Sequence, residues 1–494
     1  MIISMKYLLG IDFGGGASKA TLLCETGEIS ATATTEYPTS YPAPGYAEQN
    51  PSHWIDATIR NIKDVLKKSR INPGDIAAVS FDAATHTAVV MDDDFNVIRP
   101  AIYWTDTRST EEVLYLKENY SEIIGKQVLH KADTIWSLPE LLWIKNNEPE
   151  NWAKVKKILF AKDYVRHFFT GDYVTDYIEA EGSMLFDITK MEWSVELCSV
   201  LGISKEMLPK IIKPMDIIGK ITKEASEVTG LAEGTTVVCG TTDTVMEIFA
   251  SGAIECGDMT LKLATAGRIC VVADKPYPDI NLINYSHIAD GLFYPGTATK
   301  SCAASYRWFR DTFGGDYKDL DTMAEKVPIG CEGLVFHPYL NGELTPYANP
   351  KLCGDFTGVR AYHTKGHFAR SVLEGVAMSM LDCIKTLDDF NIPRKKRAII
   401  IGGGGKSPLW RQMVSDALDI ELIEMKHNDS SLGTAMLAGF ATGVFESLKA
   451  AVQKCNEVVS VTVPDGENTK EYAKLFRRYK AIQKALEPVY NGEY

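Results

Sequence analysis

The chain has 494 residues, of which 45% are hydrophobic and 24% charged, as is ordinary for a globular protein. This length predicts two or three domains with substantial cores. The formal net charge of −13 argues against nucleic acid or an acidic membrane surface as a partner, so an anionic substrate would need a local cationic site. The ten cysteines lie singly, without Cys-x-x-Cys, which argues against a zinc site or a disulfide framework.

Targeting signals are not evident in the sequence. It shows no long apolar segment followed by a small-residue cleavage site, and no run approaches the ~20 apolar residues of a membrane helix. We therefore expect a cytoplasmic protein without a membrane partner, whose domains pack closely because no strongly Pro/Ser-rich linker separates them.

A glycine-rich bend near the start is flanked by two short apolar runs, Tyr7–Ile11 and Ala20–Leu23, which predict a β-hairpin. Gly14 to Gly16 would let backbone N–H groups approach a phosphate closely. Asp12 could hold a hydrated Mg²⁺, and Lys19 could meet phosphate charge. An ordinary hairpin with an exposed Asp explains the pattern equally well, because no helix follows the glycines as a Walker loop or Rossmann turn requires.

Two further groups of polar residues follow predicted strands. Thr85 and His86 come after the strand Ala77–Phe81, at a position where α/β folds collect ligand contacts, although a histidine there is often only a structural hydrogen-bonder. Trp104, Asp106 and Arg108 offer an aromatic plate, an acceptor and a fork of donors, which suit a polyhydroxylated ligand. A simple Asp–Arg surface pair that caps the helix at Thr110–Asn119 is the alternative.

The buried strand Thr236–Cys239 runs into a glycine turn, and Asp243 then starts an apolar helix through Ala250. Asp before a helix is usually an N-cap, and on local grounds that role is favoured over a general base. Farther on, a strand, a small-residue bend containing Thr265 and a second strand repeat the opening pattern. This echo indicates two homologous lobes, each with a bend that reaches a phosphate.

Four glycines, Gly402, Gly403, Gly404 and Gly405, lie at the carboxyl end of a buried strand and precede a Ser-Pro helix start. This arrangement predicts a flat backbone shelf at a helix N-terminus, suited to an adenine ring and phosphates. The remaining predictions are helices over Pro51–Ser69, Thr110–Asn119, Leu138–Asn146, Lys162–Thr170, His367–Phe390, Leu432–Ala441 and Glu467–Leu486, and strands over Ala88–Met91, Gly333–Tyr339, Arg397–Ile401 and Glu421–Met425. We expect Leu432–Ala441 to complete the second lobe.

The chain resembles the FGGY carbohydrate kinases, most closely those that phosphorylate xylulose, from about Lys6 to Ala450. The segment Gly354–Glu374, with Gly-x-Phe-x-Gly-Val followed by His-Phe-x-x-Ser-Val-Leu-Glu, is similar to the C-terminal signature of the family. Further similar segments are Pro44–Pro51 with Trp54, Arg99–Arg108, Thr175–Asp187 and Gly402–Trp410.

The resemblance implies an α/β fold of two actin-like (ribonuclease-H-like) ATPase lobes around a central cleft, with residues 1–247 as the N-terminal lobe and 248–494 as the C-terminal lobe. It implies transfer of the γ-phosphate of ATP, with Mg²⁺, to a primary hydroxyl of a ketopentose, with D-xylulose as the first candidate. By this resemblance Asp243 is the catalytic base, with about 10²–10⁴-fold in rate typical of such a group. A homodimer is also compatible with it.

The resemblance assigns the other site residues as follows: Thr85, His86, Trp104, Asp106 and Arg108 to the sugar; Asp12, Gly14, Gly15, Gly16, Ser18, Lys19, Thr265, Gly267 and Gly402 to Gly405 to ATP; and Asp12 to Mg²⁺ through water.

The chain departs from the family pattern at three places. Gly15 and Gly16 stand where the family usually has Thr and Ser, Ala264-Thr265-Ala266-Gly267 stands for Gly-Thr-Ser-Gly, and Ala84-Thr85-His86-Thr87 stands where xylulokinases often have Gln-Met-His-Gly. Two alternatives therefore stay open. One is a kinase for another ketose, a polyol or a sugar acid, such as ribulose, glycerol or gluconate. The other is a nucleotide-binding sensor with little activity.

Overall fold

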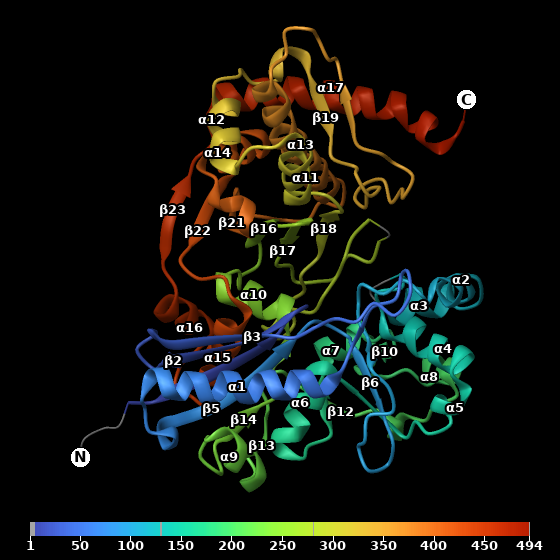
Figure 1. Cartoon of the computed structure of the whole chain (residues 1–494), viewed down its shortest axis with the longest axis vertical. Helices are drawn as coiled ribbons and strands as arrows, with labels where there is room; N and C mark the ends of the chain where they lie inside the picture. The colour runs from blue at the N-terminus through green and yellow to red at the C-terminus, as the bar shows by residue number, and fades with distance from the viewer. Residues whose placement is uncertain (1–4, 129–130, 280, 494) are drawn as a thin grey trace. The chain divides into compact units, whose positions relative to one another are not determined.

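The computed structural model describes residues 5–128, 131–279 and 281–493. They form two compact units, each built on its own β-sheet (Figure 1). The first unit comprises Met1–Ile254, Tyr285–Asp290 and His427–Glu457, and the second comprises Glu255–Asn284, Gly291–Lys426 and Val458–Tyr494.

The strands of the first unit are β1 (Tyr7–Phe13), β2 (Ala17–Cys24), β3 (Ile29–Glu36), β4 (Glu48–Gln49), β5 (Ile76–Ala83), β6 (Ala88–Met91), β7 (Ala101–Ile102), β8 (Lys157–Phe160), β9 (Val174–Asp176), β10 (Phe186–Asp187), β11 (Glu192–Trp193), β12 (Lys210–Ile212), β13 (Ile217–Lys220), β14 (Thr236–Val238) and β15 (Thr241–Thr242). Its α-helices are α1 (Pro51–Ser69), α2 (Thr110–Asn119), α3 (Ser121–Gln127), α4 (Ser137–Asn147), α5 (Pro149–Trp152), α6 (Ala161–Thr170), α7 (Tyr177–Gly182), α8 (Val195–Leu201), α9 (Lys223–Thr229), α10 (Asp243–Ser251), α15 (Ser430–Ala441) and α16 (Leu448–Cys455).

The strands of the second unit are β16 (Met259–Leu263), β17 (Gly267–Val271), β18 (Gly296–Thr299), β19 (Val335–His337), β20 (Asp355–Thr357), β21 (Arg397–Ile401), β22 (Glu421–Met425) and β23 (Val458–Thr462). Its α-helices are α11 (Ala303–Phe313), α12 (Tyr317–Glu325), α13 (Lys365–Asp389), α14 (Pro408–Leu418) and α17 (Gly466–Asn491). Short 3-10 turns lie at η1 (Pro73–Asp75) and η2 (Lys205–Met207) in the first unit and at η3 (Cys331–Gly333) and η4 (Gly403–Lys406) in the second.

The two main sheets share one topology. The first has the order β3-β2-β1-β5-β14-β13, with β15 also paired to β5, and the second has the order β18-β17-β16-β21-β22-β23. In both, the first three strands are antiparallel, the next two pairings are parallel and the last is antiparallel. The predicted echo of strand, bend and strand is therefore confirmed, and both units are α/β.

Alternation of side chains along β1 determines which helix covers which face of the first sheet. Leu9, Ile11 and Phe13 point into a hydrophobic core shared with Trp54 of α1. Gly10 points to the other face, where α15 packs (Figure 1). The sheet is thus enclosed by α1 on one side and α15 on the other.

The approach of α15 is very close because glycines line it. A Cβ on Gly10 would lie 2.0 Å from the carbonyl oxygen of Ser431. A Cβ on Gly433 would lie 2.2 Å from the carbonyl oxygen of Met246 in α10. Residues 427–457 therefore belong to the first unit, and the expectation that Leu432–Ala441 completes the second lobe is wrong. The chain does not divide simply at residue 247.

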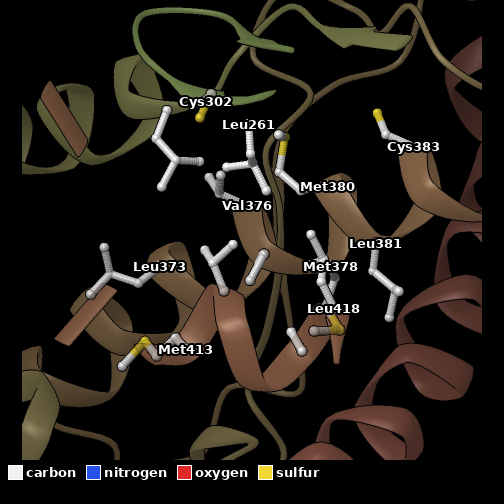
Figure 2. Close-up of a cluster of buried hydrophobic side chains, with 14 of the residues drawn as sticks. Leu261, Cys302, Leu373, Val376, Met378, Met380, Leu381, Cys383, Met413 and Leu418 are labelled. Carbon is white, nitrogen blue, oxygen red and sulfur yellow. The ribbon is translucent and has the colours of Figure 1, made fainter. Parts of the chain in front are cut away.

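The core of the second unit is organised around α13. Figure 2 shows the side chains that α13 contributes, among them Leu373, Val376 and Met380, with Met413 of α14 and Leu261 of β16 beside them. Small residues permit close packing of α13. A Cβ on Gly375, for instance, would lie 2.3 Å from the carbonyl oxygen of Phe336 in β19. The helix α17 is only partly solvated, since it buries Tyr472, Leu475, Tyr479 and Gln483.

Most local predictions are confirmed within a few residues. The helix α1 begins after Asn50, whose side-chain oxygen accepts from the backbone N–H of Ser52 at 3.0 Å. The bounds of α2, β21 and β22 agree with the expected ones. Among the described residues, every helix is too short or too polar to cross a bilayer.

We predict that Gly10→Ala destabilises the first unit. The added methyl group would collide with backbone atoms of α15, which cannot move aside as a flexible side chain would. Overpacking of this kind typically costs about 1–3 kcal/mol, and we expect the upper end of that range. Chemical denaturation followed by circular dichroism measures the free energy of unfolding.

Gly125→Ala is the matched control, because a Cβ on this exposed glycine of α3 would meet nothing within 4 Å. An alanine there should leave stability unchanged or raise it slightly. Equal unfolding midpoints for the two variants would contradict the close packing of α15 on β1.

Candidate active site

Two carboxylates stand side by side where β1 and β5 end. These strands are parallel, and their register places Asp12 opposite Asp82. Asp82 is fully buried, and its Oδ2 accepts from the hydroxyl of Thr434 in α15. The Oδ1 atoms of both carboxyl groups are buried without a hydrogen-bond partner among the described residues. The site therefore has acceptor capacity that the protein itself leaves unused.

The pKa values of both carboxyl groups of this pair are raised. Burial raises the pKa of Asp12, and the nearby charges of Asp243 and Asp429 raise it further, while a hydrogen bond with Asp82 opposes them. Burial and the charge of Asp12 likewise raise the pKa of Asp82. Buried like charges with raised pKa values are typical of functional sites.

Asp243 is placed by a tight turn and by β15. Gly240 has φ of +76°, and a Cβ there would lie 1.8 Å from the carbonyl oxygen of Phe81, so the turn requires glycine. Parallel pairing of β15 with β5 then sets Thr241 opposite Asp82. Asp243 is the first residue of α10, two positions after Thr241. The segment thus delivers the Asp243 carboxylate to the neighbourhood of the Asp12–Asp82 pair.

The N-cap alternative for Asp243 is wrong in its simple form. The N-cap position of α10 is Thr242, and Asp243 lies in the first helical turn. Its Oδ1 accepts from the backbone N–H of the adjacent Thr244 at 2.5 Å. A carboxylate in the first turn is favoured by the helix dipole, which also lowers the penalty of holding it charged.

The glycine-rich bend between β1 and β2 is closed by its own backbone. Gly14 N donates to Ala17 O at 3.0 Å, so this N–H is occupied. The carbonyl of Gly15 accepts from Nε2 of Gln49 at 2.8 Å. The N–H groups of Gly15 and Gly16 have no acceptor among the described residues, and both glycines are exposed. Two adjacent free N–H groups are donors that an anion could use.

Ser18 and Lys19, both predicted to contact ATP, lie on opposite faces of the hairpin. Lys19 pairs across the ladder with Asp12 and forms an ion pair with Asp429 at 2.5 Å. Ser18 pairs with Phe13, which faces the α1 core, and it is 0% exposed. The structure therefore keeps Lys19 with the carboxylates and places Ser18 away from them, which does not support an ATP contact for the Ser18 side chain.

Thr85 and His86 are buried in a strained loop after β5. His86 has φ of +57°, which is uncommon for a residue other than glycine and often marks a functional position. Its backbone N–H donates to Oε1 of Glu179 at 2.5 Å, and its ring lies 4.7 Å from the ring of Trp136. A Cβ on Gly182 would lie 2.9 Å from both His86 and Thr85, so the loop is tightly enclosed.

Of the three residues predicted to bind the sugar, Trp104, Asp106 and Arg108, the last two bind each other. Trp104 is 43% exposed, whereas Asp106 is buried and holds Arg108 through both carboxylate oxygens, at 2.9 and 3.0 Å from Nε. Arg108 also donates to Glu48 at 2.8 Å and lies over the ring of Tyr46. The Asp–Arg alternative is thus observed, as a buried pair rather than a surface one. A ligand contact by this pair stays a prediction.

A second set of buried charges supports the loop that carries His86. Lys162 contacts Asp163 and Asp176, the latter at 3.0 Å, and Arg166 contacts Asp163 and Asp172, each at 2.9 Å. Asp176 also accepts from the hydroxyl of Thr241 at 2.7 Å, which ties this network to the strand before Asp243. The cations of the network are already neutralised.

In the second unit the bend after β16 presents Thr265 to solvent. The carbonyl of Thr265 accepts from Cys302 N at 2.9 Å, and that of Ala264 accepts from Ala303 N at 2.7 Å. The start of α11 thereby fixes the bend. Gly267 is buried, and a Cβ there would lie 2.7 Å from Sδ of Met380, so this glycine serves packing rather than ligand contact.

Beside Thr265 lies a cavity of about 1100 Å³, within the second unit, which Gly403 and Gly404 line. A Cβ on Gly403 would meet nothing within 4 Å, whereas one on Gly404 would lie 2.8 Å from the ring of Trp410 beneath it. Gly402 and Gly405 do not line the cavity. The predicted shelf is thus formed by two of the four glycines. The cavity is large enough for a nucleotide.

Several functional candidates escaped the sequence analysis. Tyr306 and Ser407 both donate to Asp321, at 2.7 Å each, and all three line the cavity. No motif marks Asp321, because it lies in an ordinary amphipathic helix. Asp82 could have been found, since it directly follows the strand predicted before Thr85. Tyr103 was hidden because its partner in space, Gly15, lies far away in the sequence.

The chemistry of the donors fits a hydrated Mg²⁺ at Asp12. Mg²⁺ prefers oxygen ligands and usually keeps several waters. The unused Oδ1 and the raised pKa of Asp12 suit such an ion. Among the residues that the structure describes, no group of three or more His, Cys, Asp or Glu side chains is arranged to hold a metal directly. A contact through water is therefore the form that the residues allow.

Comparisons with known proteins identify the same family in both halves of the chain. Residues 7–250 match the N-terminal domain of the FGGY family of carbohydrate kinases, and residues 261–442 match its C-terminal domain. A xylulose kinase of Bacillus subtilis (strain 168) is 32% identical over 483 residues, 97% of each chain. A gluconokinase of the same organism is 29% identical over 504 residues, covering 98% of this chain and 97% of its own.

Solved structures are similar over almost the whole length. Gluconate kinase from Lactobacillus acidophilus gives a TM-score of 0.92 at 28% identity, and ligand-bound xylulose kinase from the same organism gives 0.92 at 27%. Both alignments cover 99% of this chain and 100% of the other. The actin-like fold is shared with these sugar kinases. The chain belongs to the FGGY family of carbohydrate kinases and is an ATP-dependent, xylulokinase-like sugar kinase.

Proposed function

We propose that this chain phosphorylates a neutral ketopentose at a primary hydroxyl, with D-xylulose as the first candidate. The 32% identity to a xylulose kinase over 97% of the chain supports the substrate class. The observation that carries the proposal is the placement of Asp243 at the start of α10, where its charge bears on Asp12 and Asp82. A carboxylate so placed suits a general base for a hydroxyl.

The reaction needs little covalent chemistry from the protein. Asp243 accepts the proton of the sugar hydroxyl as the hydroxyl oxygen attacks the γ-phosphorus of ATP. The new oxygen–phosphorus bond forms while the bond from the γ-phosphorus to the bridging oxygen breaks, and ADP leaves. Positioning and charge stabilisation supply most of the catalysis in such transfers. Thr85, His86 and Trp104 are the proposed sugar contacts, beside the Asp106–Arg108 pair.

The nucleotide is assigned to two sets of residues. In the second unit, Thr265 and the shelf of Gly403 and Gly404 line the cavity that takes the base and ribose. In the first unit, the free N–H groups of Gly15 and Gly16 suit phosphate oxygens. Mg²⁺, held at Asp12 through water, would neutralise phosphate charge when bound.

The charges of the first unit favour a neutral sugar over a sugar acid. Lys162 and Arg166 are each neutralised by two carboxylates, and Arg108 is held by Asp106 and Glu48. Burial also raises the pKa of Glu179, which contacts the His86 backbone, so this region resists additional negative charge. A substrate carboxylate would add such a charge, and none of these three cations is unpaired to receive it.

Gluconate remains the second candidate, because a gluconate kinase structure matches this chain with a TM-score of 0.92. ADP release measured over pentuloses, hexuloses, polyols and aldonates separates the candidates. We expect the highest kcat/KM with D-xylulose and little turnover of gluconate. Preference for gluconate would contradict the neutral-sugar proposal, and ATP binding without turnover of any sugar would indicate a sensor.

We predict that Asp243→Asn lowers sugar-dependent turnover by about 10²–10⁴-fold, because the amide cannot accept the hydroxyl proton. The dissociation constant for ATP should change little, since the cavity of the second unit is not altered. Steady-state kinetics and titration calorimetry measure the two quantities. Asp64→Asn, the same change at an exposed position of α1, is the control. Near-normal turnover of Asp243→Asn would remove this residue from the mechanism.

A further prediction concerns the shelf formed by Gly403 and Gly404. Gly403→Val should raise the dissociation constant for ATP at least about tenfold, which corresponds to about 1.4 kcal/mol, because the side chain would enter the cavity. The melting temperature should stay the same, since no described atom lies within 4 Å of the added Cβ.

Gly466→Val, at an exposed glycine with equally open surroundings, should leave ATP binding unchanged. Undiminished ATP affinity in Gly403→Val would place the nucleotide elsewhere.

A further inference from the structure

The glycine at position 15 is not required by its backbone. Its φ lies outside the left-handed range that favours glycine, so the chain there could carry any side chain. What excludes a side chain is Tyr103. A Cβ on Gly15 would lie 2.5 Å from the Tyr103 hydroxyl oxygen, which is too close for any real Cβ. At Gly16, by contrast, a Cβ would meet nothing within 4 Å.

Tyr103 is held rigidly in this position. It follows β7, its N–H donates to Ala47 O at 2.9 Å, and its carbonyl accepts from Asp106 N at 2.7 Å. Its ring packs with Ala47 and Ala84, and the residue is 6% exposed. The backbone bonds and the packing direct the hydroxyl against the glycine-rich bend.

The hydroxyl lies in the same electrostatic neighbourhood as the proposed reacting groups. Burial raises the pKa of Tyr103, and the charges of Asp243 and Asp12 raise it further. A hydrogen bond from Trp104 opposes this shift, but the net effect on the pKa is upward, so the hydroxyl keeps its proton at neutral pH. Within the described chain no acceptor for this proton is found. A protonated phenol is a hydrogen-bond donor, and oxygen atoms of phosphate are strong acceptors.

The bend has unused backbone donors beside the Tyr103 hydroxyl. The carbonyl of Gly15 is held by Gln49 and by Thr39, at 2.8 and 3.4 Å, so the peptide group is fixed. The N–H groups of Gly15 and Gly16 are free and adjacent. The Tyr103 hydroxyl stands beside them, where the side chain of residue 15 would otherwise begin.

We propose that Tyr103 donates a hydrogen bond to the transferring phosphoryl group and supplies the hydroxyl that the bend lacks at residue 15, with Gly15 kept to make room for it. This inference rests on the proposed kinase function. A donor aimed at developing phosphoryl charge acts chiefly on kcat, because it binds the transition state better than the ground state.

The test uses Tyr103→Phe, Gly15→Ser and the double variant. We expect Tyr103→Phe to lower kcat by about 10- to 100-fold, the worth of one hydrogen bond to a charged group, with the sugar KM little changed. Gly15→Ser alone should lose activity and melt at a lower temperature, because its Cβ collides with the Tyr103 hydroxyl. Tyr115→Phe, at a partly exposed tyrosine of α2, is the control and should keep full activity.

The double variant separates catalysis from packing. Without the hydroxyl, the nearest ring atom, Cζ, lies 3.5 Å from the new Cβ, an ordinary contact, so serine fits. Its hydroxyl returns a donor to the bend, and kcat should rise above that of Tyr103→Phe, with the melting temperature restored. Gly16→Ser, where space is open, should keep the wild-type melting temperature.

Two outcomes would overturn the proposal while leaving the kinase function intact. One is an unchanged kcat in Tyr103→Phe. The other is a loss of kcat that Gly15→Ser does not relieve, because that result would indicate packing alone. A wild-type chain that releases no ADP with any sugar would overturn the proposed function and this inference together.

Discussion

The register of β1 against β5 is the constraint on which the candidate site depends. It sets Asp12 beside the fully buried Asp82, and burial disfavours the charged form of each carboxyl group unless a counter-ion or donors are present. The hydroxyl of Thr434 in α15 meets part of this demand, whereas the charge of Asp429, the N-cap of α15, adds to it. The glycines that let α15 approach closely therefore also bring a hydrogen-bond donor of this helix to Asp82. The Oδ1 atoms of Asp12 and Asp82 remain without a hydrogen-bond partner among the described residues.

The shared topology of the two sheets gives each unit a bend at the same place but not the same chemistry. In the first unit, the bend has two free N–H groups and a tyrosine hydroxyl beside it, next to buried carboxylates. In the second, the carbonyls of Ala264 and Thr265 are bound to the start of α11, and the bend borders a large cavity instead. One topology thus carries a bend with free backbone donors in one unit and a bend that borders a cavity in the other. The difference lies in what packs behind each bend, α15 or α11.

The sequence predicted what is determined locally and failed where distant segments meet. The bounds of β21 and β22 and the cap at Asn50 follow from apolar runs and capping residues, which act over a few positions. The assignment of residues 427–457 to the first unit depends on two glycines in contact with distant backbone, which no local pattern reveals. The burial of Ser18 follows from which face of β2 meets α1, and only the ladder register specifies that face.

Backbone similarity alone cannot decide the substrate, because a gluconate kinase and a xylulose kinase match this chain with equal TM-scores of 0.92. The deciding difference must lie in side-chain charge around the sugar. Removing a carboxylate from water without a paired cation costs several kcal/mol, so a sugar acid requires a cation that the protein has not already neutralised. In this chain Lys162 and Arg166 form ion pairs with Asp163, Asp172 and Asp176. Arg108 forms an ion pair with Asp106. The hydroxyl groups of a neutral sugar do not require a cation, because each can both donate and accept a hydrogen bond. The pairing of these charges is therefore information about the substrate that the backbone fold does not contain.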